Sequence, residues 1–408
     1  MPAIEGPALR AWRRAHGWDV PAVSRQMRAA ARDDPLPVHD ALVRMIRRWE
    51  RHGLTTERYE LLYRALGFAD EPGRVPAPGV DTAIARADIG QARDVRAWLT
   101  GTNTSDDAIE EIDRAASYLA EIHSRLPSRT VLAQVLGVHQ SVQDVLRGGR
   151  QRLRQTRELL RIDSAVLAHA ALLLGDLGDH AAAGEYGTAA LMSAREADAD
   201  EGIAWSVLSK TARWQNRFAE AAGLARRGFE TCARAAVRAE LAYREANAVA
   251  RLGDAPRAQV ALRRAESAAE NLTDDGVSVW SFPPGRQAVF ALSVRLHTGD
   301  PDSALRVAGG AEAYWEAGGA KVTATWAQVK AGSALAHLRK ASPDGAASQL
   351  RPVLELPPEQ RIRTVTGYLD EADRMLRDRR FAGSRICAEL REQILEFTSA
   401  TSVEEGDG

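Results

Sequence analysis

The chain of 408 residues is long enough for about two or three domains with a sizeable core. Its formal net charge is −1, which excludes a protein that binds nucleic acid through its overall charge, so any basic surface must be local. An alanine-rich composition with 6% aromatic residues favours packed helices over sheet. No stretch approaches the ~18 apolar residues of a membrane span, and the N-terminus has no charged segment followed by an apolar run. We therefore expect a soluble, cytoplasmic protein that does not enter a membrane.

Residues 1–68 are predicted to form a compact helical domain. A first helix covers about 7–16, because proline suits the first turn of a helix and Gly17 follows the last periodic residue. Asp19 has the side chain that caps a second helix. An arginine-rich third helix covers 42–51, and a fourth runs from Thr55 or Thr56 to Phe68.

The segment 42–51 has two unlike faces at helical spacing. Its apolar side chains form one stripe: Leu42, Met45, Ile46 and Trp49. Its arginines form the opposite face: Arg44, Arg47, Arg48 and Arg51. Arginine pairs with the O6 and N7 atoms of guanine and also holds phosphates, so this helix suits the major groove of DNA. The same pattern also suits a solvated surface helix, and these ten residues do not separate the two interpretations.

The rest of the chain differs in charge and in pattern from this first domain. Residues 1–68 carry a formal charge of +4 and the remainder −5, which favours a small anion-binding head on a slightly acidic body. Residues 69–82 are rich in proline and glycine and are predicted to be a linker. Residues 83–397 are predicted to be helical, and the polar, acidic segment 398–408 to be a disordered tail.

Related turns recur through the helical body. Four are clear and two are weaker, and they begin at Gly178, Asn216, Gly253, Gly299, Ser342 and Arg379. Each follows one helix and starts another whose first buried residue is alanine. Successive turns are 38, 37, 46, 43 and 37 residues apart. Helix–turn–helix repeats of this length predict an all-α architecture in which the small N-terminal domain precedes an α-solenoid.

Two of these patterns resemble known families. The run from Ile46 to Gly53, followed by a helix ending at Phe68, resembles the end of the recognition helix in Cro/CI-type (XRE) helix-turn-helix domains. The repeats resemble degenerate tetratricopeptide (TPR) repeats, which follow such domains in bacterial regulators. Together the two resemblances cover nearly the whole chain.

The resemblance to XRE domains implies roles for individual residues. Placing Ile46 and Trp49 on the two core positions of the family puts Val43, Arg44 and Arg48 where the family contacts base edges, with Arg47 and Arg51 nearer the DNA backbone. One feature departs from the family: the connection Arg28–His39 is longer than its tight turn and contains two prolines.

The expected function is that of a transcriptional regulator. The head would bind double-stranded DNA, and the TPR-like body would form a homodimer and sense a peptide or small-molecule effector. The alternative is a TPR interaction scaffold whose head no longer binds DNA. We expect no enzyme, because the chain has no glycine-rich phosphate loop, His-Glu-x-x-His or Gly-x-Ser-x-Gly sequence. Cys232 and Cys387 lie outside any ligand-like cluster, so neither a metal site nor a cofactor is expected.

Four polar residues of the repeats could face an effector. Tyr243 and Asn247 lie four residues apart on one predicted helix, and Lys210 and Arg213 lie one repeat earlier. An asparagine in a groove can hydrogen-bond a peptide backbone, and lysine or arginine can hold a carboxylate. Ordinary surface polarity is the competing interpretation of all four.

Overall fold

The computed structural model describes residues 4–31, 36–68, 89–273, 276–357, 360–361 and 363–406. Within these residues the protein is all-helical, with 19 α-helices and no strand, as predicted. The chain divides into two compact units, Met1–Ala92 and Arg93–Gly408, which are described separately. The predicted linker 69–82 lies outside the described residues. None of the helices in the described part of the chain is long and apolar enough to cross a bilayer.

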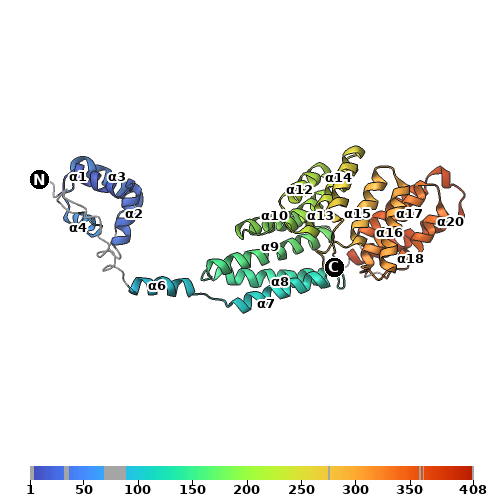
Figure 1. The fold of residues 1–408 in the computed structure, drawn as a ribbon, viewed down its shortest axis with the longest axis horizontal. Coiled ribbons are helices and arrows are strands. Elements are labelled where there is room, and N and C mark those ends of the chain that lie inside the picture. The colour runs from blue at the N-terminus through green and yellow to red at the C-terminus, as the bar shows by residue number, and fades with distance from the viewer. Residues whose placement is uncertain are drawn as a thin grey trace. The chain divides into compact units, whose positions relative to one another are not determined.

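Four helices make up the N-terminal unit (Figure 1). They are α1 (Gly6–Ala15), α2 (Val20–Ala30), α3 (His39–His52) and α4 (Glu57–Ala65). Asp19 caps α2 as predicted, because its carboxylate accepts a hydrogen bond from the Ala22 amide at 2.6 Å. The apolar stripe of α3 faces inward, where Leu42 and Ile46 are fully buried. Trp49 packs against Tyr59 of α4, with the ring centroids 4.6 Å apart.

The start of this unit is fastened to the end of α3. Ile4 and Leu54 form an isolated antiparallel bridge with backbone N–O distances of 3.1 and 2.8 Å. A Cβ atom on Gly6 would lie 2.8 Å from the carbonyl oxygens of Trp49 and Glu50, so only glycine allows α1 to start this close to α3. α1 and α3 therefore form a rigid pair.

The second unit is a succession of antiparallel helices, preceded by α6 (Ile89–Thr100), which spans the boundary between the units (Figure 1). Its earlier helices are α7 (Asp106–Ile122), α8 (Ser128–Arg147), α9 (Leu153–Asp176), α10 (His180–Glu196), α11 (Gly202–Trp214), α12 (Phe218–Thr231), α13 (Ala235–Arg251) and α14 (Ala255–Ala269). The later ones are α15 (Pro284–His297), α16 (Pro301–Glu316), α17 (Thr323–Arg339), α18 (Pro343–Leu354), α19 (Arg363–Leu376) and α20 (Arg385–Gly406).

Alternate helices form a continuous row. The helices α9, α11, α13, α15, α17 and α19 pack one against the next along this row. Each of α10, α12, α14 and α16 packs on the row helices before and after it, whereas α18 packs on α17 and on α20. This is the arrangement of an α-solenoid. The row curls on itself, because Arg363 at the start of α19 lies 5.8 Å from the Trp214 ring at the end of α11.

The repeated turns have a common backbone geometry. The first residues of the four clear turns have positive φ angles, 93° at Gly178, 59° at Asn216 and 80° at both Gly253 and Gly299. Glycine and asparagine are the residues that adopt this left-handed conformation most readily at the end of a helix. The following Asp179, like Asp254 and Asp300 in later repeats, accepts a backbone N–H of the next helix as its N-cap. One dipeptide thus ends one helix and starts the next.

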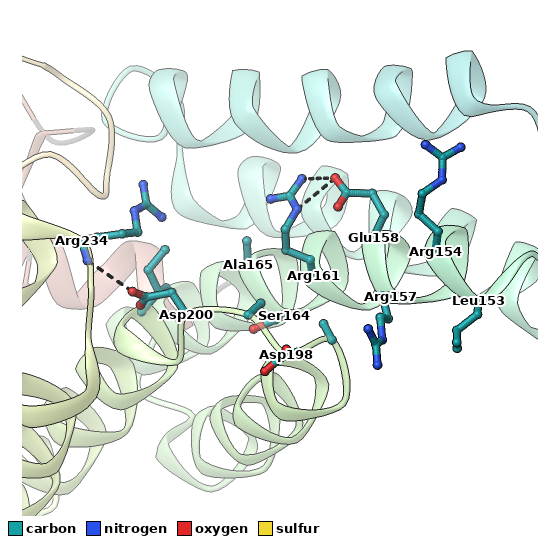
Figure 2. Close-up of a pocket in the computed structure, with 13 residues that line it drawn as sticks. Leu153, Arg154, Arg157, Glu158, Arg161, Ser164, Ala165, Asp198, Asp200 and Arg234 are labelled. Carbon is teal, nitrogen blue, oxygen red and sulfur yellow. Dashed lines mark hydrogen bonds and ion pairs between the residues drawn. The ribbon is translucent and has the colours of Figure 1, made fainter.

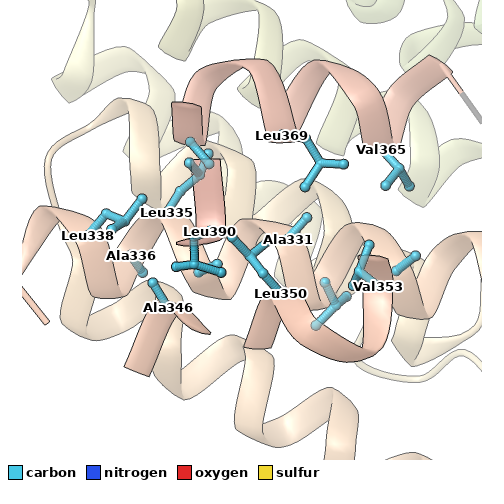
Figure 3. Packing of buried hydrophobic residues seen from close by; sticks show 14 of the residues in the cluster. Ala331, Leu335, Ala336, Leu338, Ala346, Leu350, Val353, Val365, Leu369 and Leu390 are labelled. Carbon is cyan, nitrogen blue, oxygen red and sulfur yellow. The ribbon is translucent and has the colours of Figure 1, made fainter. Parts of the chain in front are cut away.

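Small residues let the helices of the solenoid approach closely. The predicted first buried residue after each turn is a fully buried alanine in five repeats: Ala183, Ala221, Ala258, Ala304 and Ala346. Larger side chains fill the gaps, as in the C-terminal core, where Leu335, Leu350 and Leu369 come together from three helices (Figure 3). Packing of this density makes the solenoid sensitive to loss of single methyl groups.

Two details at the C-terminal end differ from the sequence prediction. The last weak turn, from Arg379, is a short 3₁₀ helix (Arg379–Phe381) rather than the start of an α-helix. The predicted disordered tail from Thr398 is helical to Gly406 as part of α20. Phe397 is buried just before this point, and no proline or glycine stops the helix until Gly406.

Candidate functional site

The exposed face of α3 is an arginine surface. Its four arginines are exposed: Arg44, Arg47, Arg48 and Arg51. Within the described residues none of the four forms an ion pair, and the one hydrogen bond among them joins Arg51 Nε to the Arg47 carbonyl at 3.2 Å. Other arginines of the same unit are paired, such as Arg64 with Glu60 at 2.8 Å. The α3 surface therefore carries positive charge that the described head does not neutralise.

An ion pair with α1 fixes the orientation of α3. Arg13 Nε lies 2.5 Å from Glu50 Oε1, and Arg13 Nη2 lies 3.0 Å from Oε2, so the contact is bidentate. Arg13 also donates to the Trp18 carbonyl, and Arg10 donates to the Glu50 carbonyl. The Glu50 side chain is 7% exposed, and its hydrogen bond raises the pKa of Arg13. Glu50 thus has a structural role and holds the arginine surface in place.

Val43 was predicted to contact base edges, and the structure corrects this assignment. Its side chain is only 8% exposed. It shares a stripe with Ile46 and Glu50 at positions i, i+3 and i+7, so the buried side of α3 is wider than its apolar residues indicate. Arg44 and Arg48 remain the exposed side chains at the predicted base-contact positions, and Trp49 is a core residue as expected.

The long connection between α2 and α3 is held by two side chains of α2. Arg28 Nη1 donates to the Pro37 carbonyl at 2.5 Å, and the Ser24 hydroxyl lies 3.1 Å from His39 Nδ1. Residues 32–35 of this connection lie outside the described residues.

Asp40 is exposed in the first turn of α3, one turn before Arg44 on the same face. The acidic residue places a negative charge at the start of the arginine surface.

The second unit has a polar inner face on its continuous row of helices. It comprises Asp176 of α9, Ser206, Lys210 and Arg213 of α11, Glu240, Arg244, Asn247 and Arg251 of α13, and Arg286 of α15. Hydrogen bonds join successive helices across it. Lys210 Nζ donates to Asp176 Oδ1 at 2.6 Å, and Arg286 Nη2 donates to Glu240 Oε1 at 3.1 Å. The face is thus a network and not a set of isolated surface groups.

Burial makes the charges of this network strongly coupled. Burial alone raises the pKa of Glu240, but Arg286 and Arg244 outweigh it, and the pKa of Glu240 is lowered. Burial lowers the pKa of Lys210, which Asp176 partly offsets. Buried carboxylates paired in this way stay ionised and hold the cations around them.

The structure places the four predicted effector residues in different environments. Lys210 and Arg213 lie on the inner face, where Lys210 is paired with Asp176, and their contact with an effector stays a prediction. Asn247 also lies there but is only 6% exposed. The prediction that Tyr243 faces an effector was wrong. Its side chain is 4% exposed in the core, with its ring centroid 5.5 Å from that of Phe282. One residue further along α13, Arg244 occupies the inner position, because the face follows the spacing of Glu240, Arg244, Asn247 and Arg251.

Sequence reasoning missed most of this network although a signal was present. Ser206, Lys210 and Arg213 of α11 recur as Glu240, Arg244 and Asn247 of α13, each exactly one 34-residue step later in the chain. Polar residues at the same three positions of consecutive repeats indicate a shared polar face.

A cavity of about 790 Å³ runs along the N-terminal half of α9 (Figure 2). Arg161 is bonded to Glu158, and Asp200 accepts the backbone N–H of Arg234 at 3.2 Å. Arg154 and Arg157 point to opposite sides of α9. Arg154 is paired with Asp106 and Arg161 with Asp113 and Glu158, whereas the exposed Arg157 and Arg234 form no ion pair within the described residues.

The cysteines and the potential metal ligands add no further candidate site within the described residues. Cys232 and Cys387 are buried and free. Within the part of the chain that the structure describes, no three His, Cys, Asp or Glu side chains are grouped to hold a metal ion. No protein-family model matches this chain, and no curated protein matches it either.

Proposed function

We propose that the protein is a DNA-binding transcriptional regulator. The arginine surface of α3 enters the major groove, with Arg44 and Arg48 at base edges and Arg47 and Arg51 at the phosphates. The solenoid forms a homodimer and senses an effector, in the manner of XRE-type regulators with TPR-like repeats. A dimer with two heads would bind half-sites about one helical turn of DNA, ~34 Å, or a multiple of it apart.

The observation that carries the proposal is the unneutralised arginine face on a helix fixed from behind. α3 is held by the buried Arg13–Glu50 pair and by the packing of Trp49, while its four exposed arginines lack a carboxylate partner among the described residues. A rigid helix loses little conformational entropy on binding, and free guanidinium groups are available for guanine and phosphate.

A second function, a protein-interaction scaffold without DNA binding, is favoured by two features of α3. Val43 is buried where the XRE resemblance places a base contact, and Asp40 puts a negative charge near the expected phosphate backbone. In this alternative the arginine surface would bind an acidic protein partner.

DNA binding is tested by gel retardation of the full chain with genomic fragments, including its own upstream region, at low salt. The proposal expects retardation of specific fragments and an affinity that falls steeply as salt rises, because each phosphate contact releases counterions. Absence of retardation at low salt would reject the regulator and favour the scaffold. Light scattering of the full chain tests the homodimer separately.

A further inference from the structure

The inner face of the solenoid ends in two guanidinium groups without a carboxylate. Arg213 is partly buried on α11, and no ion pair involves it within the described residues; its contact is with the Trp214 ring, 4.7 Å from the guanidinium carbon. Arg251 Nη1 lies 2.7 Å from His297 Nε2. His297 Nδ1 donates to the Ser293 carbonyl, so Nε2 is a neutral acceptor. Neither arginine is neutralised.

The carboxylates of the inner face are already engaged elsewhere. Asp176 binds Lys210, and Glu240 binds both Arg244 and Arg286. Burial lowers the pKa of Arg213 to about 10, and the like charge of Arg244 adds to this effect. Positive charge at this end of the face therefore exceeds the counter-charge. Asp176 offsets part of the lowering of the Arg213 pKa but is itself paired with Lys210, and Glu371 of α19, which acts on His297, is paired with Arg339.

The Trp214 indole lies at the same end of the face and has an unused hydrogen-bond donor. Trp214 Nε1 is buried and has no hydrogen-bond partner in the described part of the chain, and an indole nitrogen can only donate. The neutral His180 ring stacks on Trp214 with centroids 6.2 Å apart, and its Nδ1, which donates in one tautomer and accepts in the other, is also buried without a partner among the described residues. Arg363 of α19 approaches the same indole from across the curl, with its guanidinium carbon 5.8 Å from the ring. Excess cations and unused donors call for a group that only accepts, and an oxyanion is such a group.

We propose that this end of the inner face, formed by Arg213, Trp214 and Arg251 with Arg363 of α19, binds an oxyanion, the carboxylate or phosphate group of the effector. The inference rests on the proposed function, because it defines the chemistry of the ligand that the solenoid senses. Arg363 and Arg251 are exposed, so solvent and ligand reach the site. A bound anion would link α19 to α11 and tighten the curl of the row.

The test is a thermal-shift and calorimetric titration of the full chain with inorganic phosphate in one arm and citrate in the other, at ionic strength held constant with sodium chloride. A saturable rise in melting temperature is expected in at least one arm, and the arm that responds names the group as phosphate or carboxylate. Arg213→Gln should weaken that binding at least tenfold. No saturable response to either anion would overturn the proposal.

Matched variants separate the site from general charge effects. Arg257→Gln removes a guanidinium on α14 that is 68% exposed and paired with Asp254, so it should leave the affinity unchanged. If Arg213→Gln does not fold, Arg363→Gln decides instead, because Arg363 is exposed, and at least a fivefold loss is expected. An unchanged affinity in the folded variant, or an equal loss in Arg257→Gln, would reject the site.

The anion site and the proposed function fail in different ways. DNA retardation is measured in parallel on wild type and on Arg213→Gln without added anion. Since Arg213 lies outside the head, both proteins should retard DNA equally. Anion binding without retardation would reject the regulator alone, and retardation without anion binding would reject the oxyanion site alone.

Discussion

Replacing Glu50 with glutamine should loosen the head without touching the arginine surface directly. Glutamine keeps the size of the side chain but removes the charge that Arg13 contacts through two nitrogens, at 2.5 and 3.0 Å. Arg13 is 15% exposed, so its guanidinium cannot regain full hydration in the folded head. The substitution leaves a nearly buried cation with only a neutral partner.

The expected cost can be worked out from this geometry. Removal of one member of a buried ion pair costs about 3–5 kcal/mol. The amide oxygen of glutamine still accepts one hydrogen bond, and Arg13 keeps its bond of 2.8 Å to the Trp18 carbonyl. We therefore expect a cost at or just below the lower end of this range, about 2–3 kcal/mol in the free energy of unfolding of the head. This corresponds to about a hundredfold larger equilibrium constant for opening of the head, since each 1.4 kcal/mol is tenfold.

Hydrogen–deuterium exchange of the full chain measures this loss locally. The amides of α1 and α3 should exchange about a hundredfold faster in Glu50→Gln, while those of the solenoid stay unchanged. Replacing both partners, as Arg13→Met with Glu50→Leu, should recover much of the protection, because no buried charge is left unpaired. Unchanged exchange in α3 of the single variant would refute the argument that this pair fixes the helix.

Three further predictions concern pH, packing and charge. Burial lowers the pKa of His123 to about 4 and that of His169 to about 3. The unfolded chain therefore binds more protons than the folded chain below about pH 6.5. Between pH 7 and pH 5 the free energy of unfolding of the solenoid should fall by about 2 kcal/mol per histidine. Urea unfolding at both pH values checks this, and a pH dependence unchanged by His123→Gln would contradict it. Leu350→Ala, at a fully buried side chain in the core of Figure 3, should cost about 2–5 kcal/mol in the same urea assay, and a loss below about 1 kcal/mol would show that the core relaxes around the gap. Asp40→Asn should raise DNA affinity about two- to fivefold at low salt, by removing a negative charge beside Arg44, and equal retardation of both proteins would place Asp40 away from the DNA backbone.

The local features of the fold could be predicted from the sequence. Gly178, Gly253 and Gly299 mark turns because positive φ is a property of single residues, and the aspartates after them cap helices through neighbouring amides. The two-faced pattern of α3 is equally local. The last segment could not be judged in the same way, because composition indicated disorder while the helix continues from a buried Phe397.

The candidate sites depended on contacts between distant residues. Arg13 and Glu50 lie 37 residues apart, and nothing in either local pattern pairs them. Tyr243 was misplaced because Phe282 and Phe290, distant in sequence, pack near its ring, and Val43 because the buried side of α3 is wider than its apolar stripe. Lys210 and Arg213 could be identified from the sequence as candidate cations. Only the structure distinguishes them, because Asp176 of α9 forms an ion pair with Lys210 and not with Arg213.

The most direct test of the arginine surface is the affinity for a recovered DNA site of three folded proteins: wild type, Arg44→Ala with Arg48→Ala, and Arg64→Ala. Each base-edge contact of this kind contributes about 1–3 kcal/mol, so the double variant should bind at least about thirtyfold more weakly and discriminate less between sites. Arg64 is engaged by Glu60 on α4, and its replacement should change affinity little. An unchanged affinity in a folded double variant would contradict the assignment of α3 as the DNA-reading helix.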